Sequence, residues 1–156
     1  MLKLEIISIG TSYPTWIKEA LWEYQKRLGN ECRLSIKEIA VVKINKKGNS
    51  KERKIEEGKR IESLIDRSSY VIAMDQHGGQ WTSEIFAKKL ISWSLNKSKF
   101  QFLIGGSEGL SSAVLDRADI IWSLSKLTLP HALARLVVLE QLYRAFMINN
   151  KHPYHR

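Results

Sequence analysis

Short apolar runs alternate with segments of helical periodicity along the whole chain, and this alternation restricts the possible folds more than any other feature. Five runs are rich in β-branched residues, are bounded by Gly, Asp or Ser, and predict strands at 2–9, 34–39, 70–74, 100–104 and 120–124. Apolar residues recur at helical spacing between these runs, and a long helix is expected from Pro130 to Asn149. A βαβαβαβαβα order predicts an α/β fold with a mostly parallel sheet and helices on both faces.

The length of the chain suits one domain. Its 156 residues, 44% of them hydrophobic, are enough to bury a core, so we expect a single domain over residues 1–156. Cys32 is the only cysteine, which excludes an intrachain disulfide and fits a reducing cytoplasm. No run approaches the roughly 18 apolar residues of a membrane span, and Lys3 and Glu5 interrupt the first run. We therefore expect a soluble, cytoplasmic protein with no membrane partner.

The chain is basic, and its charge is unevenly distributed. The formal net charge is +9, and residues 43–60 hold eight Lys or Arg residues against three Glu residues. A cluster of this kind indicates a polyanionic partner, above all nucleic acid. A solvated helix face preceded by a flexible loop would have the same composition, so the cluster alone does not decide between the two interpretations.

The loops that follow the predicted strands are where a ligand is expected in an open α/β sheet. The first of these loops has a single glycine, which excludes a dinucleotide fingerprint, and no GxxxxGK[ST] phosphate loop occurs. The fourth loop places Gly105, Gly106 and Gly109 between a buried strand and a helix. Glycines there allow a ligand to approach the backbone closely, although a tight strand-to-helix turn would use the same residues.

The fifth loop, "WSLSKLTLPH" from Trp122 to His131, is apolar and hydroxylic. It lacks the acidic residue with which an NAD site normally contacts ribose. Its backbone N–H and C=O groups could bind a neutral adenine, with Leu124, Leu127 and Leu129 as apolar walls. The alternative is a strand end that merely packs under the long helix.

Three segments carry a resemblance to a known family: "FLIGGSEGLSSAVLDRAD", "WSLSKLTLPHALARLVVLEQLYRA" and the terminal "HPYHR". They resemble the ribosomal large-subunit pseudouridine methyltransferase H family, a small branch of the SPOUT methyltransferases. The resemblance implies a trefoil knot in the C-terminal part of the α/β fold, and a homodimer. It also implies the use of S-adenosyl-L-methionine to methylate N3 of a pseudouridine in 23S ribosomal RNA, on the assembled ribosome.

The resemblance also implies the cofactor contacts. Carried over position by position, they fall on Met74, Gly105, Leu124, Ser125, Lys126, Leu127, Thr128 and Leu129. Met74 stands where leucine is common in the family, and Ser107 stands where proline often follows the two glycines. Both differences are mild if the contacts use backbone and apolar surface, and Met74 is the assignment that they affect most.

Methylation of an imide nitrogen needs an in-line approach to the methyl group and the loss of a proton. Residues that could accept the proton or stabilise the developing anion are Glu108, His131, Arg135, His155 and Arg156. The sequence does not choose among them. His152 and His155 have Pro153 between them and no carboxylate nearby, so no metal is expected.

The terminal segment "NKHPYHR" has the composition of a substrate clamp. Pro153 restricts the backbone and leaves Tyr154 free to stack on a base, and His152, His155, Arg156 and Arg135 complete the predicted RNA contacts. The long helix carries more apolar surface than one sheet face needs, which predicts a two-fold interface.

Two other functions remain open: an RNA-binding or ribosome-assembly protein without enzymatic activity, and a nucleotide-binding regulatory domain.

Overall fold

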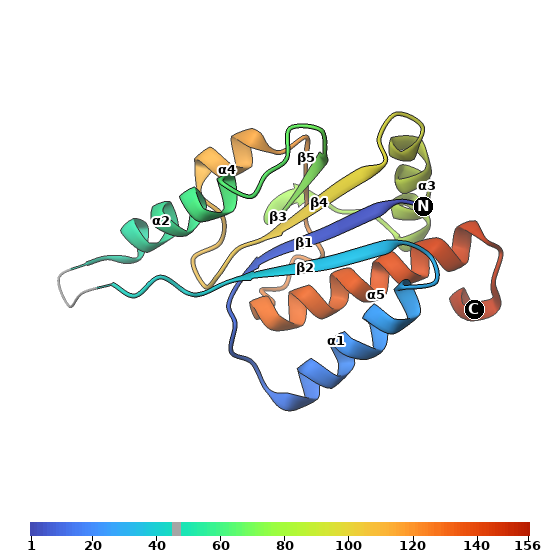
Figure 1. Cartoon of the computed structure of the whole chain (residues 1–156), viewed down its shortest axis with the longest axis horizontal. Helices are drawn as coiled ribbons and strands as arrows, with labels where there is room; N and C mark the ends of the chain where they lie inside the picture. Colours follow the sequence, from blue (N-terminus) through green and yellow to red (C-terminus); the bar gives the residue numbers. More distant parts are fainter. Residues whose placement is uncertain (45–47) are drawn as a thin grey trace.

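The structure is a computed structural model that describes residues 1–44 and 48–156. Its strands are β1 (Lys3–Ile9), β2 (Arg33–Ile39), β3 (Tyr70–Gly79), β4 (Lys99–Ile104) and β5 (Ile120–Trp122). Its helices are α1 (Thr15–Leu28), α2 (Ser50–Glu62), α3 (Ser83–Ser94), α4 (Ser112–Arg117) and α5 (His131–Asn149), followed by the 3₁₀ turn η1 (Pro153–His155). The strands form one parallel sheet, as the alternating pattern predicted, and the structure shows their order to be β2-β1-β4-β3-β5 (Figure 1).

Helices cover both faces of the sheet, because successive side chains of a strand point to opposite sides. Leu4 and Ile6 of β1 belong to one hydrophobic cluster, to which α1, α3 and α5 also contribute. Ile7 and Ile9 belong to a second cluster, together with residues of α2 and α4. We call these the first face and the second face; Figure 1 shows α1 and α5 on the opposite side of the sheet from α2 and α4.

Side-chain caps set the first residue of three helices. Asn49 accepts a hydrogen bond from the backbone N–H of Glu52 at 2.9 Å, so α2 begins five residues before its first apolar residue, Ile55. Thr82 and Ser111 cap α3 and α4 in the same way. A polar side chain placed just before each helix therefore fixes where α2, α3 and α4 begin.

A stack of aromatic side chains fixes the end of β5. Trp122 packs on Phe86 with ring centroids 4.4 Å apart and on Trp81 at 5.3 Å. A Cβ atom at Gly78 would lie 2.7 Å from the backbone of β5, so only glycine permits this approach. Ser123 N–H donates to the carbonyl oxygen of Gly79 at 2.9 Å. β5 ends here, two residues before the predicted end at Leu124, and the next loop starts from a rigid support.

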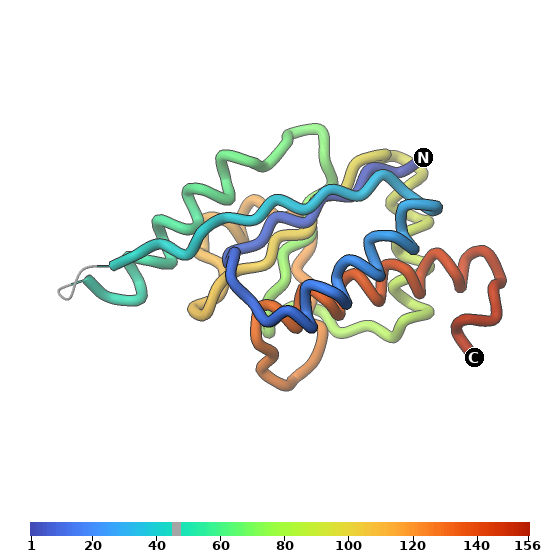
Figure 2. Tube along the Cα trace, turned by 60° about the horizontal axis from the view of Figure 1, so that its bottom comes forward, coloured from blue at the N-terminus to red at the C-terminus, as the bar shows by residue number. Residues whose placement is uncertain are grey.

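The long helix α5 packs between α1 and α3 on the first face, and the chain terminus folds against its end (Figure 2). Within the described residues, no helix is both long enough and apolar enough to cross a bilayer.

Candidate active site

The carboxyl ends of the parallel strands share one edge of the sheet. Two predicted cofactor loops follow β4 and β5, whereas Met74 lies within β3, which continues to Gly79. Met74 of β3 pairs with Trp122, the last residue of β5, and Gly105 follows β4, the other neighbour of β3. The structure therefore brings Met74, Gly105 and the 124–129 loop to the same edge. In an open α/β sheet this is the edge at which ligands bind.

The glycines after β4 form a tight turn. Gly109 N–H donates to the carbonyl oxygen of Gly106 at 3.0 Å, and Gly109 has a φ of +79°. A Cβ atom at Gly105 would lie 2.5 Å from the carbonyl carbon of Gly109. Gly105 is thus required by the backbone of its own loop, and the tight-turn alternative is sufficient to explain it. Contact of this loop with a cofactor stays a prediction.

The loop after β5 is shaped by its own hydroxyl groups. Ser123 Oγ donates to the carbonyl oxygen of Ser125 at 3.0 Å, and Ser125 Oγ accepts from the N–H of Leu127 at 3.0 Å. Leu124 packs partly buried against the core of the first face, whereas the side chain of Leu127 is exposed. Leu127 is therefore an exposed apolar side chain at this edge of the sheet, with the exposed polar residues Lys126 and Thr128 beside it.

His131, the first residue of α5, lies against the loop after β1. Gly10 has a φ of +112°, and a Cβ atom there would lie 2.8 Å from Nε2 of His131. Burial lowers the pKa of His131, and the positive charge of Arg135 lowers it further. A neutral imidazole therefore persists at pH 7 beside the predicted cofactor loop, in the state that can accept a proton.

Arg135 is completely buried, one turn further along α5. Its Nη1 donates to Glu38 Oε1 at 3.1 Å and its Nη2 donates to the carbonyl oxygen of Gly10 at 3.0 Å. The guanidinium lies over the ring of Tyr13 at 4.9 Å, and Tyr13 also donates to Glu38. The predicted role of Arg135 in RNA binding would require this network to open. Sequence reasoning missed Tyr13 and Glu38, because no motif links residues so far apart.

Glu108, another predicted catalytic residue, belongs to the second face. Arg53 Nη1 of α2 donates to Glu108 Oε1 at 3.1 Å, and Ser107 Oγ donates to Oε2 at 2.8 Å. Glu57 lies nearby, 3% exposed, and burial followed by the charge of Glu108 raises the pKa of its carboxyl. Since His131 belongs to α5 on the first face, the structure does not show Glu108 and His131 acting as a pair.

The basic segment 43–60 is described only in part. α2 contains Lys51 and Arg53, whereas Lys46 and Lys47 lie outside the described residues. The Arg53–Glu108 ion pair joins this segment to the glycine turn after β4.

The terminal segment is held by its own chain rather than being free. Tyr154 Oη donates to Glu140 Oε1 at 3.2 Å, and its ring packs on Tyr143 with centroids 4.8 Å apart. His155 Nε2 lies 2.8 Å from Glu84 Oε1. Nδ1 of His152 accepts from the N–H of Tyr154 at 3.2 Å. Base stacking by Tyr154 therefore requires it to leave these partners or to offer the remaining face of its ring.

The terminal segment and His131 lie at opposite ends of α5. The helix has 19 residues, which corresponds to a length of about 28 Å. Figure 2 shows the C-terminus at the far end of α5 from the loop that precedes the helix. Within one chain, His155 and Arg156 are thus separated from His131 and the 124–129 loop.

Metal binding and thiol chemistry both depend on particular side chains. Within residues 1–44 and 48–156, no three His, Cys, Asp or Glu side chains gather into a group able to hold a metal ion. Cys32 is buried, and burial, with a smaller contribution from the charge of Glu31, raises the pKa of its thiol to about 12. A thiol with this pKa is protonated at pH 7 and is a poor nucleophile.

The fold is similar to that of a solved structure described as "a probable methylase family protein" from Haemophilus influenzae. The two chains are 16% identical and superpose with a TM-score of 0.57, covering 98% of this chain and 70% of the other. At this identity the likeness concerns the fold alone.

Sequence comparison gives the family. The protein-family model described as "Predicted SPOUT methyltransferase" matches residues 2–155 of this sequence. A protein of Nitrosococcus oceani is 40% identical over 155 residues, covering 99% of each chain, and one of Coxiella burnetii is 39% identical over 99% of this chain and 100% of the relative. Both relatives carry the name "Ribosomal RNA large subunit methyltransferase H". The chain therefore belongs to the ribosomal RNA large subunit methyltransferase H family of SPOUT methyltransferases.

Proposed function

We propose that this protein transfers a methyl group from S-adenosyl-L-methionine to N3 of a pseudouridine in 23S ribosomal RNA, acting on the assembled ribosome in the cytoplasm. The observation that carries the proposal is the match to ribosomal RNA large subunit methyltransferase H proteins over 99% of the chain. The pseudouridine and its N3 atom come from the resemblance of the three motifs. The net charge of +9 fits a polyanionic substrate.

The 124–129 loop, Met74 and Gly105 would hold the cofactor. The exposed side chain of Leu127 and the partly buried Leu124 fit the apolar faces of an adenine. The hydrogen bonds of Ser123 and Ser125 hold the loop backbone in one shape, which reduces the ordering needed on binding. When bound, the cofactor supplies an electrophilic methyl group.

His131 fits the role of base best among the candidates. Its imidazole is half-buried and neutral, and it lies at the edge of the sheet that carries the cofactor loops. Glu108, by contrast, already accepts hydrogen bonds from Arg53 and Ser107. We propose that Nε2 or Nδ1 of His131 takes the N3 proton, and that the fixed loops supply the in-line geometry.

A homodimer would place the C-terminal end of α5 of one chain near the N-terminal end of α5 of the other. Leu133, Leu136 and Val137 of this helix are only partly buried in the single chain. A two-fold pairing through this surface would let the terminal segment of one chain reach the cofactor loop of the other. His152, Tyr154, His155 and Arg156 of the partner would then contact RNA, so each active site would be built from two chains.

Two features of chain organisation complete the proposal. Residues 1–156 form one domain, and the segment after β4 is threaded as a trefoil knot. The support for the knot is the family resemblance of the two motifs between Phe102 and Ala145.

Calorimetric titration with S-adenosyl-L-methionine, followed by a methyl-transfer assay on ribosomes that lack this methylation, tests the proposal. We expect micromolar cofactor binding and one methyl group per ribosome, located at a pseudouridine by mass spectrometry of nuclease fragments. RNA binding without cofactor binding would instead support an assembly protein. Cofactor binding without transfer to ribosomes would support a nucleotide-binding regulatory domain.

A further inference from the structure

Three cations form a row across adjacent strands at the amino edge of the sheet. The register pairs Lys3 of β1 with Arg33 of β2 on one side and with Lys99 of β4 on the other. Paired residues of parallel strands point to the same face and lie about 4.8 Å apart. Like charges at such positions repel one another and destabilise the sheet. A row of this kind therefore needs a reason other than stability.

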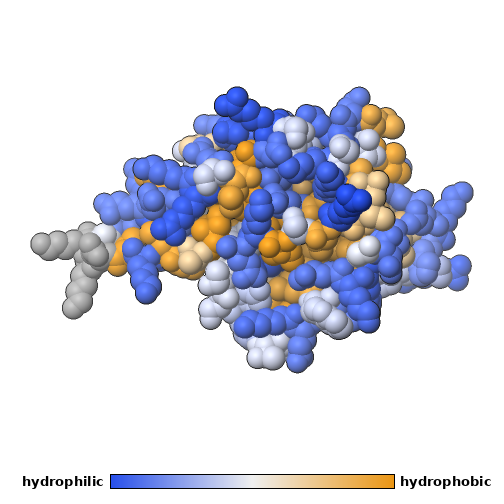
Figure 3. All heavy atoms as spheres, viewed as in Figure 1, coloured by the Kyte–Doolittle hydropathy of each residue, from blue (hydrophilic) through white to orange (hydrophobic). Residues whose placement is uncertain are grey.

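The row lies on a part of the second face that no helix of the described residues covers. α2 and α4 pack over the other end of the strands, where Ile7, Ile9 and Leu103 form the second cluster with them (Figure 1). Lys3 and Arg33 are exposed. Figure 3, in the same view, shows hydrophilic side chains over much of this side of the molecule, with smaller hydrophobic areas between them. Parallel sheets are normally covered on both faces, so this bare end is unusual.

Acidic neighbours neutralise only part of the positive charge. Lys99 forms an ion pair with Asp66, and Lys37 of β2 pairs with Glu5 at 2.9 Å. Among the described residues, Lys3 and Arg33 have no ion-pair partner. Two cations of the row therefore remain available to an anion.

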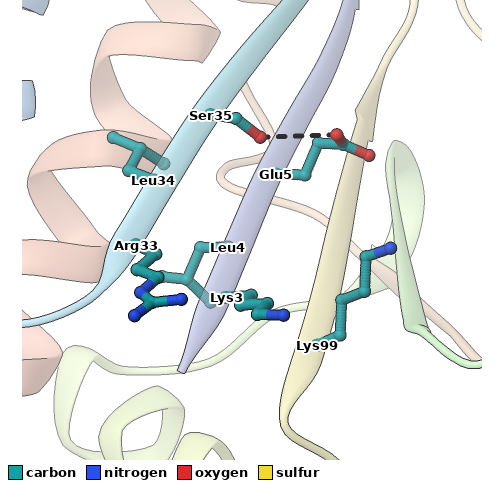
Figure 4. Close-up of a pocket in the computed structure, with 7 residues that line it drawn as sticks. All are labelled: Lys3, Leu4, Glu5, Arg33, Leu34, Ser35 and Lys99. Atoms are coloured by element: carbon teal, nitrogen blue, oxygen red, sulfur yellow. Dashed lines mark hydrogen bonds between the residues drawn. The ribbon is translucent and has the colours of Figure 1, made fainter. Parts of the chain in front are cut away.

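A shallow hollow accompanies the row. It is lined by Lys3, Leu4, Glu5, Arg33, Leu34, Ser35 and Lys99 (Figure 4). Glu5 is a buried residue, 8% exposed. Its carboxylate accepts hydrogen bonds from Ser35 Oγ at 3.3 Å and from Gln101 Nε2 at 2.5 Å. With Lys37 also bound to it, Glu5 contributes little repulsion to an anion that meets the exposed cations.

We propose that the row formed by Lys3, Arg33 and Lys99 binds the phosphate backbone of a ribosomal RNA segment other than the one that carries the methylated base. This inference rests on the proposed function, because it takes ribosomal RNA as the substrate. The row lies at the first residue of β1, and the predicted cofactor loops lie beyond its last, Ile9, about 20 Å away. Phosphates held at the row therefore anchor a folded RNA at a distance from the reaction.

The test compares charge-neutral and charge-preserving variants of the full-length protein. Lys3→Gln with Arg33→Gln removes the two unpaired cations, and Lys88→Gln with Arg117→Gln removes one exposed Lys and one exposed Arg elsewhere as the control. Ribosome binding is measured from 50 to 200 mM salt. We expect the first double variant to bind about tenfold more weakly at 100 mM and to lose about 1.4 to 1.8 from the salt slope. The control should match the parent.

Three further results decide the matter. The first double variant should melt at the parental temperature or above it, because like-charge repulsion is removed, and should keep the parental affinity for S-adenosyl-L-methionine. Lys3→Arg with Arg33→Lys should keep the parental salt slope. An unchanged slope for the neutral variant, or an equal loss in the charge-preserving one, would overturn the inference while leaving the proposed function intact. A parent that methylates no ribosomes would overturn the proposed function itself.

Discussion

Nη2 of Arg135 and the carbonyl oxygen of Gly10 are 3.0 Å apart, so the long C-terminal helix is bonded to the loop that leaves the first strand. Glu38, the second-to-last residue of the edge strand β2, accepts a hydrogen bond from the same guanidinium. One buried side chain thus joins three segments at the edge of the sheet where the cofactor is expected.

Arg135→Met should lower the free energy of unfolding by about 2 to 4 kcal/mol, because it leaves Glu38 and the Gly10 carbonyl without their donor. Urea denaturation monitored by tryptophan fluorescence measures the loss. Arg27→Met is the matched control, since its ion pair with Glu23 is solvent-exposed and contributes about 0 to 1 kcal/mol. Equal effects of the two substitutions would contradict the importance of the buried network.

The lowered pKa of His131 predicts a pH dependence of stability. The unfolded chain, with a histidine pKa of about 6.5, takes up a proton before the folded state does. Stability contributed by this group is therefore complete above pH 6.5 and is lost as the pH falls from about 6.5 towards the folded pKa. His131→Gln should remove this slope from melting temperatures measured between pH 5 and 7.5. NMR titration of the His131 ring should give a midpoint below pH 6.5.

Substitution of Gly105 tests its steric role. Gly105→Ala places a Cβ atom 2.5 Å from the backbone of Gly109 and should cost about 1 to 3 kcal/mol of stability, before any cofactor is added. Gly109→Ala meets no atom within 4 Å but keeps a φ of +79°, so it should cost about 1 to 2 kcal/mol. Thermal melting without ligand measures both. A fully stable Gly105→Ala variant would show that the turn can relax.

Glu57→Gln should stabilise the protein at pH 8 by about 1 kcal/mol and leave it unchanged near pH 4. The pKa of Glu57 is raised, first by burial and then by the charge of Glu108, so its contribution to stability is present at low pH and is lost as the pH rises through the folded pKa. Glu56→Gln, on the exposed side of α2, is the control and should change stability by less than about 0.5 kcal/mol at either pH.

Tyr154→Phe keeps the ring contact with Tyr143 but removes the hydrogen bond to Glu140. We expect a loss of about 1 kcal/mol in urea denaturation and little change in cofactor affinity. Deletion of residues 152–156 should cost more stability, because it also removes the ring and the His155–Glu84 contact. Methyl transfer to ribosomes should collapse in the deletion variant. Parental transfer rates without the segment would refute its predicted role as a clamp.

The order of the elements followed from the sequence because local patterns encode it. Alternating apolar runs predicted each strand of the sheet, and helical spacing predicted the long helix, which the structure places at His131–Asn149. β3 continues to Gly79, beyond the predicted end at Met74, because Gly78 allows it to return to β5. That close approach depends on tertiary packing, which single-strand patterns do not contain.

The positions of the glycine and hydroxyl loops in the fold were predictable, whereas the polar contacts around them were not. The glycine and hydroxyl loops lie at the carboxyl edge, where their sequence context placed them. The burial of Arg135 was not predictable, because its partner Glu38 lies 97 positions earlier in the chain. The same limit applies to Tyr154, whose partner Glu140 appears in the sequence as an ordinary polar residue of a helix. Long-range pairing of polar groups leaves no periodic signal.

The position of α5 in the core has a consequence for synthesis of the protein. Val138, Leu139 and Leu142 of this helix are completely buried in the first hydrophobic cluster, so the first face has no complete core until α5 has emerged from the translating ribosome. The nascent chain must expose the apolar side of β1 and β4 until then. An enzyme proposed to act on ribosomes thus completes the core of its first face only once α5 has left the ribosome that makes it.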